Sequence, residues 1–206
     1  MSLSTVELWN QNTFLAINAG AQARGFVVAI ARVQASWAIY VAMILLLLAW
    51  VRRGNAIRFA LLDATNAALI GLGIAQGISA FWYHPRPFEI GLGRQLLDHV
   101  PEASFPSDHA TLMFSLAMPL LLSPTSRRWG TAFLLLGFAV AWSRIYLGVH
   151  FPLDMLGAFG VAGFACLLIW MVRPHLHRLL YPLLVSIYEI MLRRLGLPDA
   201  VFPRNL

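Results

Sequence analysis

The chain has 206 residues, of which 59% are hydrophobic and only 12% are charged. This composition excludes an ordinary soluble domain of this size and fits a small polytopic membrane protein. The net charge is +6, and all 15 basic residues are arginines, which gather at the ends of apolar runs. Membrane topology therefore explains the positive charge better than a nucleic-acid partner, and we expect no such partner.

The N-terminal segment, residues 1–22, mixes polar and apolar side chains. The apolar positions within 4–19 recur at helical spacing, which predicts an amphipathic helix lying at the membrane interface. A basic start and a continuous apolar core are both missing, so we do not expect a cleavable signal peptide.

Five apolar runs follow, and each is expected to cross the lipid bilayer as a helix. They cover approximately 26–51, 57–82, 107–122, 129–146 and 152–172. The remaining residues, 174–206, are expected to form an amphipathic tail. Its apolar stretch, 179–195, either forms a sixth span or lies on the membrane surface, and Pro182 with basic residues at both ends favours the surface.

The predicted fold class is therefore an all-α integral membrane protein. We expect a bundle of five, possibly six, transmembrane helices with amphipathic terminal helices, forming one membrane-embedded domain over residues 1–206. The single cysteine, Cys166, lies inside an apolar run and is expected to pack in the interior.

Three polar stretches interrupt the apolar runs, at residues 84–88, 105–109 and 143–154. Charged groups at membrane depth are costly and tend to mark functional sites. Successive spans alternate in direction, so all three stretches are expected at the same end of the bundle. The opposite end carries most of the arginines, which assigns that end to the cytoplasm and the polar stretches to the outer face.

The residue types in these stretches favour phosphoryl transfer. A helix beginning near Ser107 offers free N–H groups to an anion. Arg86 and Arg144 supply planar guanidinium groups that can each hold two phosphoryl oxygens. Two histidines, His109 and His150, could act as nucleophile and general acid.

The neighbours of each histidine suggest its role. Asp154 follows His150 by four residues, about one helical turn, and a carboxylate there would orient the ring. We therefore expect His150 to be the nucleophile and Asp154 its orienting partner. His109 has only Asp108 beside it in sequence, so it is better suited to be the acid.

Other interpretations remain open at this point. Asp154 could simply be an acid in a first helical turn, and Ser107 a helix N-cap. His109 and His150 could be axial ligands of a haem-binding membrane electron carrier, although Arg86 and Arg144 would not serve that function. A non-catalytic lipid transporter or scaffold would need polar residues extending through the spans. We expect no metal and no cofactor, since no dense carboxylate or Cys/His set is present.

Three motifs resemble the signatures of the type 2 phosphatidic acid phosphatase superfamily: Arg86-Pro87, 106–109 (Pro-Ser-Asp-His), and Ser143-Arg144 with His150 and Asp154. Asp108, where many members have glycine, makes the second motif similar to that of the bacitracin-resistance type of undecaprenyl-pyrophosphate phosphatase. The resemblance implies a metal-independent enzyme of the bacterial inner membrane with a polyprenyl pyrophosphate substrate. Phosphatidate, phosphatidylglycerol phosphate and lipid A are the alternative substrates.

The resemblance also implies roles for individual residues. His150 would be the nucleophile, His109 the general acid, and Arg86, Ser107, His109 and Arg144 would surround the phosphate, with Asp154 as the catalytic partner of His150. Beyond what the resemblance implies, Asp108, Arg94 and His99 are further candidate phosphate ligands. One position departs from the family pattern, because Ser79 stands where the first motif usually has lysine. Arg94, His84 or His99 could supply the missing cation.

Overall fold

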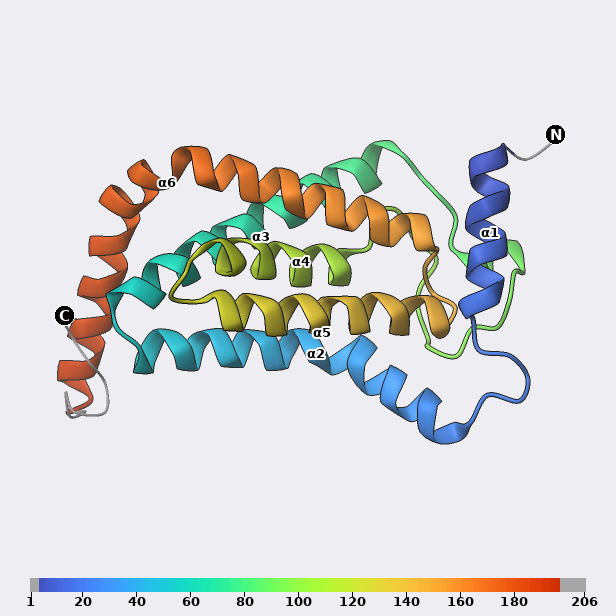
Figure 1. Cartoon of the computed structure of the whole chain (residues 1–206), viewed down its shortest axis with the longest axis horizontal. Coiled ribbons are helices and arrows are strands. Elements are labelled where there is room, and N and C mark those ends of the chain that lie inside the picture. Colours follow the sequence, from blue (N-terminus) through green and yellow to red (C-terminus); the bar gives the residue numbers. More distant parts are fainter. Residues whose placement is uncertain (1–3, 197–206) are drawn as a thin grey trace.

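The structure, a computed structural model, describes residues 4–196, which form six α-helices and one short 3-10 helix and contain no β-strand (Figure 1). The elements are α1 (Thr5–Ile17), α2 (Gly25–Arg52), α3 (Asn55–Phe81), η1 (Pro87–Ile90), α4 (Asp108–Leu122), α5 (Arg127–Tyr146) and α6 (Pro152–Arg194). Helices α2, α3 and α6 are long and apolar enough to cross a membrane, and α4 is a shorter apolar helix. The predicted all-α membrane fold is confirmed, with α2 to α6 at the positions of the five expected spans.

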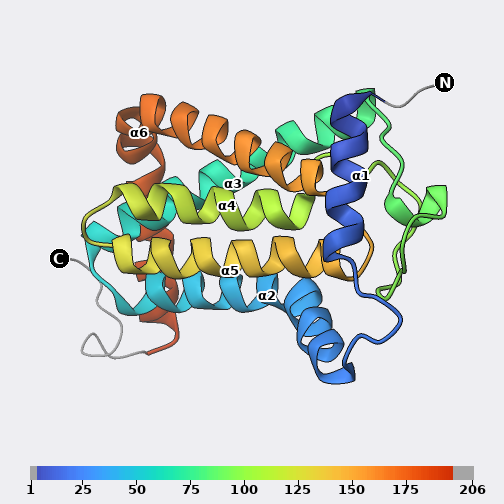
Figure 2. The ribbon, with the colours of Figure 1, turned by 45° about the vertical axis from the view of Figure 1, so that its right-hand side comes forward.

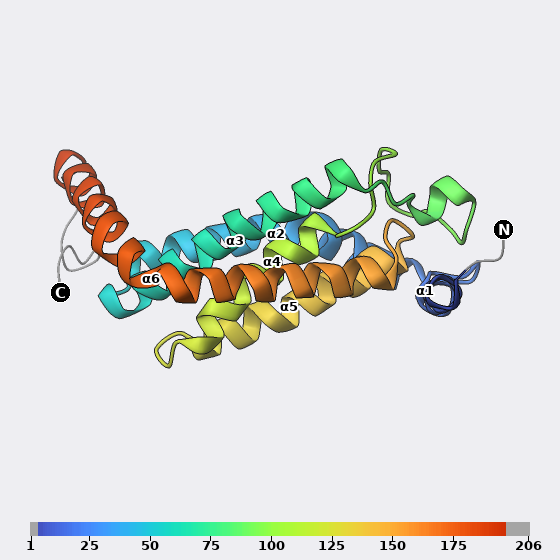
Figure 3. The ribbon, with the colours of Figure 1, turned by 90° about the horizontal axis from the view of Figure 1, so that it is seen from above.

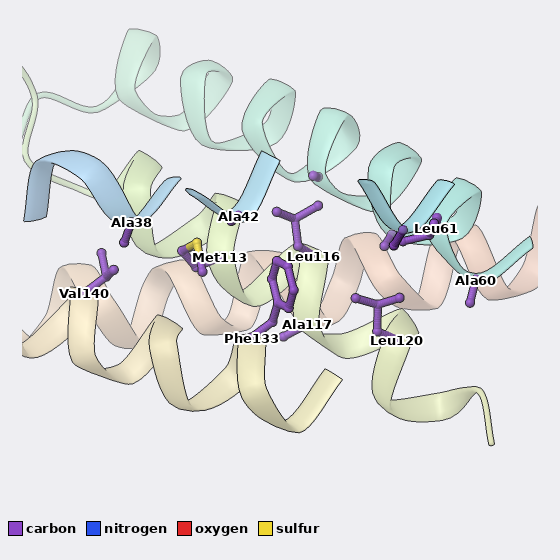
Figure 4. Packing of buried hydrophobic residues seen from close by; sticks show 13 residues of the cluster. Ala38, Ala42, Ala60, Leu61, Met113, Leu116, Ala117, Leu120, Phe133 and Val140 are labelled. Atoms are coloured by element: carbon purple, nitrogen blue, oxygen red, sulfur yellow. The ribbon is translucent and has the colours of Figure 1, made fainter. Parts of the chain in front are cut away.

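Helix α4 lies in the middle of the bundle and packs against α3, α5 and α6 (Figures 1 and 2). Nine of its 15 residues are buried, as expected of a helix that is apolar on nearly every side. Met113, Leu116 and Leu120 pack there between Ala42 of α2 and Phe133 of α5 (Figure 4). The polar ends of the bundle are thus separated by a continuous apolar core.

Small residues let the helices around α4 approach closely. A Cβ atom on Gly71 of α3 would lie 2.5 Å from the Ser115 Oγ, and one on Gly130 of α5 would lie 2.3 Å from the Leu121 backbone nitrogen. Larger side chains would push these helices apart, which is the usual reason for glycine at membrane helix contacts.

Helix α1 lies across one end of the bundle (Figures 1 and 3). The predicted helix in this segment is confirmed, and the Ser4 hydroxyl caps it by accepting from the Glu7 N–H at 3.2 Å. The buried Asn10 side chain accepts from the Leu153 N–H at 3.0 Å, and Phe14 packs edge-on against Phe151. Helix α1 therefore fixes the start of α6.

Helix α6 is longer than the sequence suggested. The sequence predicts a boundary near Val172, but the helix continues to Arg194 and only bends (Figure 3). Pro174 and Pro182 lie inside it, and proline removes a backbone hydrogen bond and commonly kinks a helix without ending it. Below the bend, the Tyr181 hydroxyl donates to Asn55 at 2.6 Å and the Tyr188 hydroxyl to the Val51 carbonyl at 2.9 Å. These contacts to the start of α3 and the end of α2 fix the C-terminal part.

The long connection between α3 and α4 is folded against the same end of the bundle as α1. Its Ser104 N–H donates to the His84 carbonyl at 2.8 Å, and its Leu96 N–H donates to the Leu147 carbonyl at 2.8 Å. Arg32 of α2 also donates to the Leu96 carbonyl, at 2.9 Å. The connection is therefore an ordered cover over the ends of α5 and α6.

Candidate active site

The three polar stretches meet at the end of the bundle that α1 covers (Figures 1 and 3). Arg86 comes from the α3–α4 connection, Ser107 from the start of α4, and Arg144 from the last turn of α5. His150 lies in the short α5–α6 turn, and Asp154 lies in the first turn of α6. All five side chains are buried.

One ring nitrogen of His150 is fixed by two oxygen-bearing side chains. Its Nδ1 lies 3.1 Å from the Asp154 Oδ2 and 3.3 Å from the Ser104 Oγ. The same Oδ2 accepts from the Ser104 hydroxyl at 2.5 Å and from the Phe151 N–H at 2.7 Å. A proton on Nδ1, facing the carboxylate, leaves the lone pair on Nε2.

The other ring nitrogen faces two guanidinium groups. The His150 Nε2 lies 3.0 Å from Arg86 Nη1 and 3.3 Å from Arg144 Nη2. An electron-rich nitrogen between two cations is well placed to attack a group that carries several negative oxygens. The arrangement therefore suits a phosphoryl group approaching Nε2 while both arginines bind its oxygens.

Arg86 is held rigidly by the chain around it. Its side chain donates to the Val149 carbonyl at 2.9 Å, to the Glu102 carbonyl and carboxylate at 3.1 Å each, and to the Ala103 carbonyl at 3.4 Å. Burial lowers the pKa of this guanidinium, and the Glu102 and Asp154 carboxylates act in the opposite direction. The guanidinium group of Arg86 is therefore preorganised, and little conformational entropy is lost when it binds an anion.

Several buried polar atoms at the site have no hydrogen-bond partner among residues 4–196. They include the Ser107 Oγ and the Arg144 Nε. Ser107 occupies the N-cap position of α4, yet its hydroxyl does not cap the helix. Buried donors are almost always satisfied in folded proteins. These two are therefore available to an anion bound beside His150 and the N-terminus of α4.

The electrostatic surroundings keep His150 neutral. Burial lowers the pKa of its imidazole well below the usual 6.5, and Arg144, Arg86, His99 and His109 lower it further. The pKa of His99 is also lowered, first by burial and then by Arg86. A neutral ring with a free Nε2 is the form that a nucleophilic histidine requires.

His109 lies in the first turn of α4 and is half-buried. It is close enough to His150 to influence its charge. Its neighbour Asp108 is oriented by Gln76 of α3, whose amide donates to the Asp108 Oδ2 at 2.7 Å. His109 therefore lies near His150, on the first turn of α4.

Comparisons with known proteins agree with this geometry. Residues 60–178 match the family described as the PAP2 superfamily. This chain belongs to the PAP2 superfamily.

The chain is similar to the putative undecaprenyl-diphosphatase YbjG of Escherichia coli, with 33% identity over 90% of this chain and 93% of the relative. It is also similar to the undecaprenyl-diphosphatase BcrC of Bacillus subtilis, with 31% identity over 77% of this chain and 81% of the relative. Among solved structures, LpxE of Aquifex aeolicus has the same fold, with a TM-score of 0.65 and 21% identity over 79% of this chain and 95% of that one.

The residues of the three PAP2 motifs account for most of the site. The exception is position 79, where this chain has serine in place of the usual lysine. The Ser79 hydroxyl donates to the Phe105 carbonyl at 3.1 Å, so it anchors the α3–α4 connection. Of the three candidate replacements, only His99 lies beside His150, with its ring centroid 6.3 Å from that of His150. His84 instead pairs with Glu7 of α1 at 3.6 Å.

Arg94 also has a different partner from the one expected. Its guanidinium donates to the Gly20 carbonyl at 2.6 Å, and its backbone exchanges hydrogen bonds with the Asn18 side chain. The structure therefore gives Arg94 contacts to the α1–α2 connection and none to the histidines among the described residues. Its predicted role as a phosphate ligand has no geometric support here.

Ser104 is the site residue that sequence reasoning missed. It is fully buried and bridges Asp154 and His150. A serine two residues before the second motif carries little signal in a chain with many serines. Only the fold of the connection brings it to a carboxylate 50 residues away in sequence.

Proposed function

We propose that this protein hydrolyses undecaprenyl diphosphate to undecaprenyl phosphate and inorganic phosphate. The observation that carries the proposal is the position of His150, with Nδ1 against Asp154 and Nε2 between Arg86 and Arg144. The names of the relatives supply the substrate: the proteins from E. coli and B. subtilis that align over most of their length are named for undecaprenyl diphosphate.

In the first step, the His150 Nε2 attacks the terminal phosphorus, and the bond from that phosphorus to the bridging oxygen breaks. His109 gives its proton to the departing oxygen, so undecaprenyl phosphate leaves. Asp154 stabilises the positive charge on the phosphorylated ring. Arg86, Arg144, the Ser107 hydroxyl and the N-terminus of α4 bind the three equatorial oxygens as charge spreads over them.

In the second step, water attacks the phosphohistidine. His109 takes a proton from this water, and the N–P bond breaks to release inorganic phosphate. His150 returns to its neutral form with the proton still on Nδ1. His99 lies near enough to contact the second phosphate of the substrate, which would account for its predicted role.

The distribution of arginines supports an active site on the outer face of the cytoplasmic membrane. The end of the bundle away from the site carries Arg52, Arg53, Arg127, Arg128, Arg173 and Arg178. Arg86 and Arg144, at the site end, are committed to the histidine. The positive-inside rule then gives the arginine-rich end to the cytoplasm and the site to the periplasmic side.

The test is phosphate release from a panel of detergent-dispersed lipids by purified protein. Undecaprenyl diphosphate should be the best substrate, ahead of phosphatidate, phosphatidylglycerol phosphate and lipid A. His150→Ala should lower kcat at least about a thousandfold, because the covalent route is lost. Faster turnover of another lipid in the panel would reassign the substrate. Full activity of His150→Ala would exclude the mechanism, and a Soret band in the purified protein would favour the haem alternative.

A further inference from the structure

An apolar groove follows the outside of the bundle between α2 and α3, with α4 at its base. One part has a volume of about 450 Å³ and extends to Leu72 and Leu112. A second part, of about 310 Å³, extends to the C-terminal part of α6. Both parts are lined by Leu47, Trp50, Leu61 and Thr65, so they form one continuous groove.

One end of this groove lies about one helical turn from the start of α4, where the active site begins. Leu72 of α3 and Leu112 of α4 line it. One helical turn further towards the site, Gln76 and Asp108 join the same two helices by a hydrogen bond of 2.7 Å. Asp108 is flanked in sequence by Ser107 and His109. A lipid whose phosphate is bound at His150 thus has this apolar surface within about one helical turn of the start of α4.

The other end is closed by the bent part of α6, which we call the C-terminal arm (residues 175–194). Leu184, Ile187 and Met191 of the arm line the groove. The buried Tyr188 fastens the arm through its hydrogen bond to Val51. Outside the groove lining, His177 of the arm also pairs with Asp63 of α3 at 2.7 Å. The arm is therefore a fixed end wall.

The length of the groove determines how long a prenyl chain it can bind. Gln76 and Leu61 are 15 residues apart on α3 (76 − 61), which corresponds to about 22 Å of helix. The arm extends the apolar surface beyond Leu61, so the groove covers most of the ~30 Å hydrocarbon core of a bilayer. A short prenyl chain anchored at the site cannot reach the arm, whereas a long one can.

We propose that this groove binds the prenyl chain of the substrate along its length and that the C-terminal arm selects long chains. The inference rests on the proposed function, because it takes the diphosphate to be bound at His150. Leu184, Ile187 and Met191 are specificity-determining residues that contact the far end of a long chain. Their contacts contribute only when the chain is long enough to reach them.

The decisive comparison uses Leu184→Trp, which fills the groove at the arm, and Leu183→Trp, its neighbour outside the groove lining. Leu183 is 55% exposed and Leu184 is 37% exposed, so both positions accommodate a larger side chain. We expect Leu184→Trp to lower kcat/KM for undecaprenyl diphosphate about tenfold while that for farnesyl diphosphate stays within about twofold. Leu183→Trp should leave both unchanged. Equal losses on both substrates, or no change in their ratio, would overturn the inference.

A labelling experiment on the unaltered protein does not depend on how the variants fold. A prenyl diphosphate with a diazirine at the far end of its long chain should label the arm and the end of α2, at residues 184–191 and 47–51. Labelling of the outer face of α5, around Leu135, would overturn the proposal. So would equal labelling of the arm by a photoreactive phospholipid, since that would make the groove a general lipid contact.

The two proposals fail in different ways. If the protein hydrolyses neither diphosphate, the proposed function is wrong. If it hydrolyses both and Leu184→Trp leaves their ratio unchanged, only the role of the groove is wrong.

Discussion

At the residue scale, the site depends on how side chains from the α3–α4 connection, α5 and α6 constrain one imidazole. Asp154 and Ser104 hold the Nδ1 of the His150 ring, and two arginines lie beside its Nε2. The sequence alone predicted His150, Asp154 and both arginines, because their motif spacing is specific. It could not predict Ser104 or the contact between Arg94 and Gly20, since both depend on the path of the α3–α4 connection.

Ser104 is expected to act as a positioning residue. Replacing it by alanine removes a hydrogen bond to the Asp154 carboxylate and leaves the His150 ring less well oriented. Ser104→Ala should lower kcat about tenfold with little change in KM, because the loss falls on the reacting geometry. Ser123→Ala, at the opposite end of α4, is the control and should keep full activity. Unchanged kcat in Ser104→Ala would show that Asp154 alone orients the ring.

The charge state of His150 gives a second prediction at this scale. Its pKa is lowered, so the folded protein keeps the ring neutral at pH values where a free histidine is protonated. As the pH falls, the ring gains its proton only well below 6.5, and the nucleophile is lost there. Nitrogen-15 NMR of histidine-labelled protein, assigned with His150→Gln, should show His150 neutral at pH 6. A titration midpoint at or above 6.5 would contradict the burial of the ring between two cations.

At the scale of elements, apolar runs and polar breaks predicted α2 to α5 to within a few residues, and the predicted N-terminal helix is present. They did not predict the length of α6, because a proline in a helical segment indicates a helix end in the sequence. Tertiary contacts can nevertheless stabilise a helix that continues past a proline. Tyr181 and Tyr188 make such contacts. Nor could the sequence show that α1 lies against the start of α6.

The contact between α1 and α6 should affect both stability and catalysis. Asn10→Ala removes the acceptor for the Leu153 N–H in the first turn of the helix that carries Asp154. Losing this buried bond should cost about 1–2 kcal/mol of stability and lower kcat several-fold. Thermal unfolding in detergent and phosphate release measure the two effects. Asn12→Ala, on the exposed side of α1, should change neither, and an equal effect of both variants would rule out a specific role for Asn10.

At the scale of the whole molecule, alternating helix directions bring residues from three loops to one end of the bundle and leave most arginines at the other. The sequence predicted this division because spans and charges can be counted. It could not predict the groove between α2 and α3, which arises from how far two neighbouring helices diverge around α4.

The orientation in the membrane can be measured by cysteine accessibility. In a Cys166→Ser background, Val100→Cys marks the site end and Thr125→Cys marks the opposite end, and both positions are exposed. An impermeant maleimide should label Val100→Cys in intact spheroplasts and Thr125→Cys only after permeabilisation. The reverse pattern would place the active site in the cytoplasm.

In the proposed mechanism, His150 carries the phosphoryl group during turnover. Rapid quenching of the protein with undecaprenyl diphosphate labelled in its terminal phosphate would detect this intermediate. We expect an acid-labile, alkali-stable phosphate on the peptide that contains His150, formed and lost at rates that account for kcat, and absent from His150→Ala. Turnover at the full rate without such an intermediate, or with the phosphate on another residue, would contradict the mechanism.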